Sequence, residues 1–176
     1  ILKEVAETKL VGVDAQAESL LLADLLVRLQ LMKRYQNAKV LSVIRKMTLH
    51  LFHADALTWD PGQWGGILPT VFEIILGNPP YVGEKGNTAL FHEARSSLFG
   101  QKYYEKNMDY AYYFLHRGLD LLAPGGRLAY LTTSYFATAD GASLLRRRLQ
   151  SETDFQWLIN TESITLFPHA KGQHNL

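Results

Sequence analysis

Short apolar runs alternate with helical segments along this chain, and this alternation limits the possible folds more than any other feature. Runs typical of buried strands occur at residues 9–14, 48–52, 71–76, 127–133 and, more weakly, 155–160. Helical periodicity is found at residues 15–35, 108–122 and 140–149. Strands separated by helices predict a mostly parallel sheet with helices on both faces. The predicted fold class is therefore α/β.

Composition narrows the function classes. A chain of 176 residues with 47% hydrophobic side chains has enough apolar material for one compact domain. Its 18 Lys and Arg residues nearly balance 17 Asp and Glu residues, so a surface for nucleic acid has to be local or lie elsewhere in the polypeptide. The absence of cysteine removes disulfides, thiolate zinc sites and cysteine nucleophiles, and it is compatible with a cytoplasmic protein. No apolar run reaches the roughly 18 residues of a membrane span.

Polar side chains follow three of the predicted strands. Asp14 ends the first strand, Asp55 follows the second, and Asn78 follows the third. Ligands of parallel α/β sheets bind beyond the carboxyl ends of the strands. We therefore expect Asp14, Asp55 and Asn78 to line one crevice.

Each of the two carboxylates has two interpretations. Asp14 can accept hydrogen bonds from ribose hydroxyls, as acidic residues do in dinucleotide folds, or it can cap the helix that follows. Asp55 can accept a hydrogen bond from the exocyclic amine of a bound adenine, or it can cap a turn. For each of these two carboxylates, the sequence leaves both the nucleotide-binding and the capping interpretation open.

The stretch Asn78-Pro79-Pro80-Tyr81 points to a more specific chemistry. Two prolines remove two backbone donors, so the strand before them has to end. An exocyclic amine is a poor nucleophile because its lone pair is delocalised. The side-chain oxygen of Asn78 and the backbone carbonyl of Pro79 can accept its two N–H bonds and thereby localise that lone pair. Tyr81 offers a face for a planar base to stack on, a contact worth about 1–3 kcal/mol.

These motifs resemble a known family. The segment VFEIILGNPPYVG, with KLVGVD and HADAL before it and MDYAYYFLHRGLDLLAPGGRLAYLTTSYF after it, is similar to the N6-adenine DNA methyltransferases of prokaryotic restriction-modification systems. The resemblance is strongest to long polypeptides that fuse modification, target recognition and often cleavage. It implies a Rossmann-like fold, S-adenosylmethionine as cofactor, and double-stranded DNA with a flipped adenine as substrate.

The resemblance also assigns roles to residues. Asp14 matches the contact to the ribose of the cofactor and Asp55 the contact to its adenine amine. Ala56 and Asn78 are expected beside the cofactor as well.

The catalytic residues implied by the family are the tetrapeptide from Asn78 to Tyr81. Tyr81 and Phe167 are expected to pack on the flipped base.

The chain departs from the family pattern in two places. A glycine-containing loop after a first strand is expected before KLVGVD, where only ILKEVAET is found, and a target-recognition region is expected beyond residue 176. We therefore expect residues 1–176 to form a single, partial catalytic domain that lacks the first strand and binds the cofactor poorly.

Several alternatives remain open. The same tetrapeptide occurs in methyltransferases that act on protein glutamine or on RNA bases, and a non-catalytic scaffold that binds DNA or a partner is a further possibility. Arg146, Arg147 and Arg148 either contact phosphates or form a solvated helix face. Residues 83–107 are expected to be an irregular lid or binding loop. The six histidines show no spacing typical of metal ligands, so no metal is expected.

Overall fold

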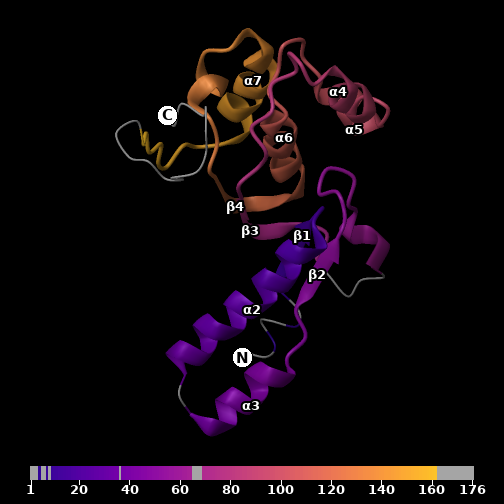
Figure 1. Ribbon diagram of the computed structural model, residues 1–176. Coiled ribbons are helices and arrows are strands. Elements are labelled where there is room, and N and C mark those ends of the chain that lie inside the picture. Colours follow the sequence, from indigo (N-terminus) through magenta and orange to yellow (C-terminus); the bar gives the residue numbers. More distant parts are fainter. Residues whose placement is uncertain (1–3, 5–6, 8, 36, 65–68, 162–176) are drawn as a thin grey trace. The chain divides into compact units, whose positions relative to one another are not determined.

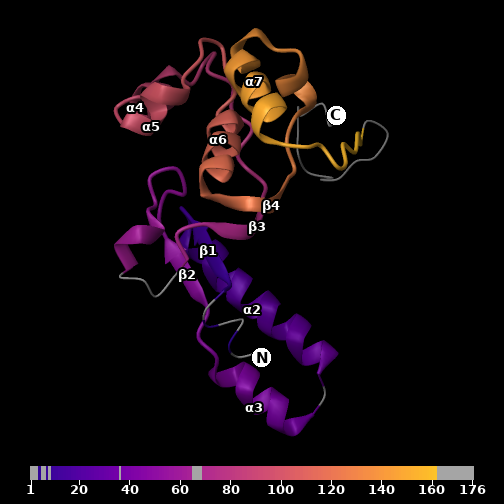
Figure 2. The ribbon, with the colours of Figure 1, turned by 180° about the vertical axis from the view of Figure 1, so that it is seen from behind.

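The chain forms an α/β fold, as predicted, in a computed structural model that describes residues 4, 7, 9–35, 37–64 and 69–161. It divides into two compact units, Ile1–Val71 and Phe72–Leu176. Each unit contains a pair of parallel strands with helices packed beside it. Figures 1 and 2 show the elements from opposite sides. The expectation of a single partial domain stays a prediction.

The first unit is built on strands β1 (Val11–Asp14) and β2 (His50–His53), which pair in parallel. Helix α2 (Ala17–Arg34) packs on both strands, and α3 (Ala38–Lys46), which the sequence analysis did not predict, packs on α2. The core of the unit centres on two buried side chains, with partly buried apolar residues around them: Ile44 and Met47, then Val27, Leu31, Met32, Val40, Leu41 and Leu49.

Local polar contacts explain why α3 forms. The side chain of Asn37 accepts a hydrogen bond from the backbone N–H of Lys39, at 2.9 Å, which caps the start of the helix. At its other end, the guanidinium of Arg28 donates to the carbonyl oxygens of Ile44, at 2.6 Å, and Met47, at 2.9 Å. The last turn of α3 is thereby fixed to α2.

The second unit contains strands β3 (Phe72–Gly77) and β4 (Leu122–Tyr130), which also pair in parallel. Their register is irregular between Phe72 and Ile74. The Pro-Gly-Gly sequence at residues 124–126 lies in β4, directly opposite this irregular part of β3. Gly125 has a φ of 73°. The sequence analysis correctly ended a helix before these residues, but β4 already begins at Leu122.

Helix α6 (Ala111–Leu121) is the centre of the second core. Most of its side chains are buried, including Tyr112, Tyr113 and His116. It packs on β4, where Gly118 lies so close that a Cβ atom would be 2.7 Å from the side chain of Leu128. The absence of a side chain at this position lets the helix approach the strand.

The expectation of an irregular loop at residues 83–107 is wrong, because two short helices lie there. They are α4 (Thr88–Ala94) and α5 (Leu98–Tyr103). The hydroxyl of Ser97 accepts a hydrogen bond from the N–H of Gly100, at 3.0 Å, and caps α5. Phe91 and Tyr103 bury their rings in the second core, so aromatic residues that suggested a binding loop instead hold these helices in place.

The remaining helical elements are short turns followed by one longer helix. They are η1 (Pro61–Trp64), η2 (Ser134–Ala137), η3 (Asp140–Ala142) and α7 (Ser143–Glu152). None of the helices in the described part of the chain has the length and apolar character needed to cross a membrane.

The predicted fifth strand at residues 155–160 is wrong. This segment has no regular secondary structure, and its apolar side chains are exposed, with Trp157 at 85% and Ile159 at 78%. Strand formation requires a neighbouring backbone to complete the hydrogen-bond ladder, and apolar composition alone does not supply one.

Candidate active site

The tetrapeptide Asn78-Pro79-Pro80-Tyr81 begins immediately after β3 ends at Gly77. The last backbone hydrogen bond before the tetrapeptide joins the N–H of Leu131, just after β4, to the carbonyl of Gly77, at 3.0 Å. The two prolines that follow have no N–H group, so the ladder cannot continue. Asn78 is exposed, Pro79 is buried and Tyr81 is half-buried. The strand end was predicted correctly, and the asparagine side chain reaches the surface there.

The hydroxyl of Tyr81 makes two short contacts that the sequence analysis missed. It lies 2.6 Å from Oδ1 of Asn78 and 2.9 Å from the carbonyl oxygen of Leu131. Burial, followed by the nearby charge of Asp109, raises the pKa of Tyr81 above its usual value, so the phenol stays protonated. The amide that was expected to face a target amine is thus linked to a tyrosine hydroxyl.

Asp109 fixes the backbone that follows the tetrapeptide. Its Oδ1 accepts hydrogen bonds from the N–H of Val82, at 3.2 Å, and from the N–H of Ala111, at 2.9 Å. Burial raises the pKa of Asp109, and these two hydrogen bonds partly counteract that effect. The N–H of Tyr110 also donates to the carbonyl of Val82, at 2.8 Å. The start of α6 therefore holds the chain next to Tyr81, a role signalled in the sequence only by an aspartate two residues before a helix.

Asp14 stands at the end of β1, as predicted. Its Oδ1 accepts a hydrogen bond from the N–H of Gln16, at 2.7 Å, just before α2. This contact closes a turn just before α2 and does not cap the helix, because Gln16 is the N-cap residue and α2 has no side-chain cap hydrogen bond. It uses only one carboxylate oxygen of Asp14. Within the described residues, no donor bonds to the other oxygen.

Asp55 follows β2 and is exposed. Its Oδ1 accepts a hydrogen bond from the N–H of Leu57, at 2.9 Å, and its carbonyl accepts one from Trp59, at 2.8 Å. Ala56, which lies in the same turn, is half-buried. The turn-capping interpretation is again realised with one oxygen, and the second has no donor in the part of the chain that the structure describes.

Asp14 and Asp55 lie at the same end of one sheet. Asp14 is paired with His53, and the N–H of Ala54 donates to the carbonyl of Asp14 at 3.0 Å. Asn78 belongs to the other unit. The prediction that all three side chains line one crevice therefore stays a prediction, and Phe167 lies outside the described residues.

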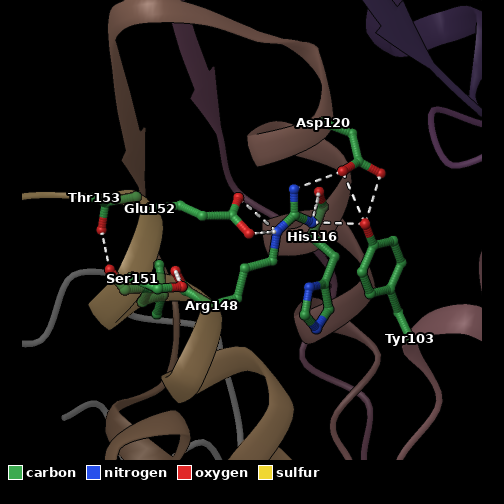
Figure 3. Close-up of polar contacts among 8 residues, drawn as sticks. Tyr103, His116, Asp120, Arg148, Ser151, Glu152 and Thr153 are labelled. Atoms are coloured by element: carbon green, nitrogen blue, oxygen red, sulfur yellow. Dashed lines mark hydrogen bonds and ion pairs between the residues drawn. The ribbon is translucent and has the colours of Figure 1, made fainter.

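The arginine triplet on α7 is mostly committed to protein contacts. Arg146 donates to the carbonyl oxygens of Phe136, at 3.0 Å, and Ala139, at 2.6 Å. Arg148 forms ion pairs with Asp120, at 2.6 Å, and Glu152, at 2.9 Å (Figure 3). Only Arg147 is exposed, so it is the member of the triplet best placed to meet solvent or a phosphate.

Among the residues that the structure describes, no group of three or more His, Asp or Glu side chains could hold a metal ion.

The family assignment follows from a comparison with known proteins. Residues 8–167 match the model of the Eco57I restriction-modification methylases. The chain belongs to this family. The match includes both strand-end carboxylates, the tetrapeptide and Asp109.

Individual relatives of this methylase chain agree with the assignment. The chain is 31% identical over 99 residues to the type II methyltransferase M.XhoI of Xanthomonas vasicola, and this match covers 54% of the chain and 18% of the relative. It is 33% identical over 105 residues to M.TthHB8I of Thermus thermophilus, covering 56% and 23%. It is 27% identical over 114 residues to M.HincII of Haemophilus influenzae, covering 58% and 23%. The chain thus spans about a fifth of the length of these relatives.

Proposed function

We propose that this chain carries the catalytic segment of a DNA methyltransferase that methylates the N6 amino group of adenine within a restriction-modification system. The observation that carries the proposal is an exposed Asn78 at the carboxyl end of β3, followed by two prolines and a tyrosine, in a chain of a restriction-modification methylase family. The substrate is double-stranded DNA with the target adenine turned out of the helix, since an amine inside the duplex cannot reach this segment.

Asn78 and Pro79 supply the chemistry of the site. The side-chain oxygen of Asn78 and the carbonyl oxygen of Pro79 each accept one N–H bond of the adenine amine. No described residue donates to the Pro79 carbonyl, so it is available for this role. With both protons held in these hydrogen bonds, the nitrogen lone pair is turned out of conjugation with the ring. The rigid proline backbone keeps both oxygens in place without reorganisation.

The cofactor that fits the residues of the first unit is S-adenosylmethionine. Among the residues that the structure describes, no donor bonds to the second carboxylate oxygen of Asp14 or of Asp55, which suits the ribose hydroxyls and the adenine amine of a nucleoside. When bound, this cofactor supplies an electrophilic methyl group. The role of the two carboxylates is to bind and orient it.

The test is methyl transfer by the full-length protein with Asn78→Ala. We expect the rate of transfer of a labelled methyl group to duplex DNA to fall about 100- to 1,000-fold, because one of two acceptors is removed from the site. Gln150→Ala is the control, since it removes an exposed amide on α7 and should leave the rate unchanged.

Three outcomes contradict the proposal. A full rate in the Asn78→Ala protein rules out the acceptor role. Label found in protein or RNA but never in DNA assigns another substrate class. Binding of DNA without any transfer indicates a non-catalytic scaffold.

A further inference from the structure

The hydroxyl of Tyr81 has one proton but lies within hydrogen-bond distance of two acceptor oxygens. A phenolic hydroxyl donates one hydrogen bond, yet its oxygen lies 2.6 Å from Oδ1 of Asn78 and 2.9 Å from the carbonyl oxygen of Leu131. The Leu131 carbonyl can only accept. If the proton is used on Asn78, the Leu131 carbonyl faces a lone pair, and Oδ1 of Asn78 is occupied.

Rotation of the Asn78 amide by half a turn removes the conflict. The amide oxygen and nitrogen then exchange places with almost no change in shape. In that arrangement Nδ2 of Asn78 donates to the Tyr81 oxygen, and the Tyr81 hydroxyl donates to Leu131. All the polar atoms of the contact are satisfied, and Oδ1 of Asn78 is left free on the other side.

We propose that the Tyr81 hydroxyl is a positioning group that orients the Asn78 amide, with the Leu131 carbonyl fixing the direction of its proton. This inference rests on the proposed function of Asn78. The orientation matters because the two ends of the amide are opposite in character. An outward oxygen accepts an N–H of adenine, whereas an outward NH₂ group presents donors to a donor and repels it.

The surroundings hold this arrangement rigidly. The N–H of Leu131 donates to the carbonyl of Gly77 at 3.0 Å, so the carbonyl of Leu131 is fixed at the end of the paired strands β3 and β4. On the other side, Asp109 holds the N–H of Val82. The Leu131 carbonyl that contacts the Tyr81 hydroxyl and the backbone that follows Tyr81 are therefore both fixed by hydrogen bonds.

The test is Tyr81→Phe in the full-length protein, which keeps the ring and removes only the hydroxyl. We expect the single-turnover rate of methyl transfer to fall about 10- to 100-fold, because the amide loses its fixed orientation. The KM for DNA and the fluorescence of a 2-aminopurine placed at the target position should stay unchanged, since stacking and base flipping need only the ring.

Tyr113→Phe is the matched control. It removes a tyrosine hydroxyl that donates to the backbone carbonyl of Gly100, at 3.3 Å, in the same unit. We expect this variant to keep the full transfer rate, and unfolding midpoints of both variants separate a loss of stability from a loss of orientation.

The outcomes distinguish this inference from the proposed function. A full transfer rate in Tyr81→Phe, with Asn78→Ala inactive, overturns the positioning role and leaves the acceptor role intact. Equal rate losses in Tyr81→Phe and Tyr113→Phe also overturn it. Full activity in Asn78→Ala refutes the proposed function itself.

Discussion

At the scale of single residues, His116 shows how strongly the second core controls protonation. Its side chain is 1% exposed and stacks on the ring of Tyr103, with 4.1 Å between ring centroids. Its Nδ1 has no hydrogen-bond partner among the described residues. Burial, and then the charge of Arg148, lowers the pKa of His116 to about 4, while Asp120 opposes the shift and Lys102 adds to it weakly. The imidazole is therefore neutral at physiological pH.

This shift makes the stability of the fold depend on pH. Because the pKa of His116 lies below its unfolded value of 6.5, the unfolded chain binds an extra proton between about pH 4 and pH 6.5. The contribution of His116 is complete above pH 6.5 and is lost as the pH falls toward 4, by about 3 kcal/mol. Urea denaturation of the wild type and of His116→Phe across this range measures it.

The His116→Phe variant should show a flatter dependence of unfolding free energy on pH. His92→Gln is the control, because His92 is exposed and its replacement should leave the dependence unchanged. An unchanged slope in His116→Phe would contradict the neutral, buried state of this histidine.

Also at the residue scale, the position of Asn78 at the end of β3 could be predicted from the sequence, whereas the contact from Tyr81 to Leu131 could not. Two adjacent prolines after an apolar run predict the strand end and the exposed asparagine, because both follow from local backbone chemistry. The contact from Tyr81 to Leu131 spans 50 residues of sequence. Nothing local at Tyr81 signals it, since it arises only when β3 and β4 pair.

At the scale of elements, Arg148 joins three helices of the second unit. Its guanidinium donates to Tyr103 of α5, at 2.9 Å, to the carbonyl of His116 and to the carboxylate of Asp120, both of α6, at 3.1 Å and 2.6 Å (Figure 3). Its side chain is 12% exposed. Loss of this planar, multiply bonded group removes a donor from the buried Tyr103 hydroxyl and the cation that balances Asp120.

We therefore expect Arg148→Ala to lower the free energy of unfolding by about 2 kcal/mol, a value reduced from that of a fully buried ion pair because Asp120 is partly exposed. Denaturant unfolding measures this change. Arg147→Ala, at the exposed neighbouring position, should stay within about 0.5 kcal/mol of the wild type. Equal effects of the two substitutions would show that Arg148 does not hold the helices together.

Elements with long periodic or β-branched segments could be predicted, and those that depend on partners could not. Helices α2, α6 and α7, strands β1 to β3 and the second half of β4 follow from the spacing of apolar residues. The segment at residues 155–160 has the composition of a strand but no neighbouring strand to pair with among the described residues. Helices α4 and α5 form because the rings of Phe91 and Tyr103 are buried in the core of the second unit. Such tertiary contacts are not encoded in local periodicity.

At the scale of the whole molecule, net charge and coverage of the relatives decide how the proposed function is tested. A formal net charge of +1 offers little general attraction to DNA, so the proposed function requires DNA contacts from local surfaces. The chain spans 18% of one relative and 23% of others. Activity is therefore best measured in the full-length protein.

The most direct measurement of the central claim is the chemical identity of the methylated product. Duplex DNA is incubated with the full-length protein and labelled S-adenosylmethionine, digested to nucleosides and separated by chromatography. We predict that all the label is found in N6-methyl-2′-deoxyadenosine and that Asn78→Ala slows its formation about 100- to 1,000-fold. Label in a methylated cytosine, or undiminished label in Asn78→Ala, would contradict the proposed chemistry of the tetrapeptide.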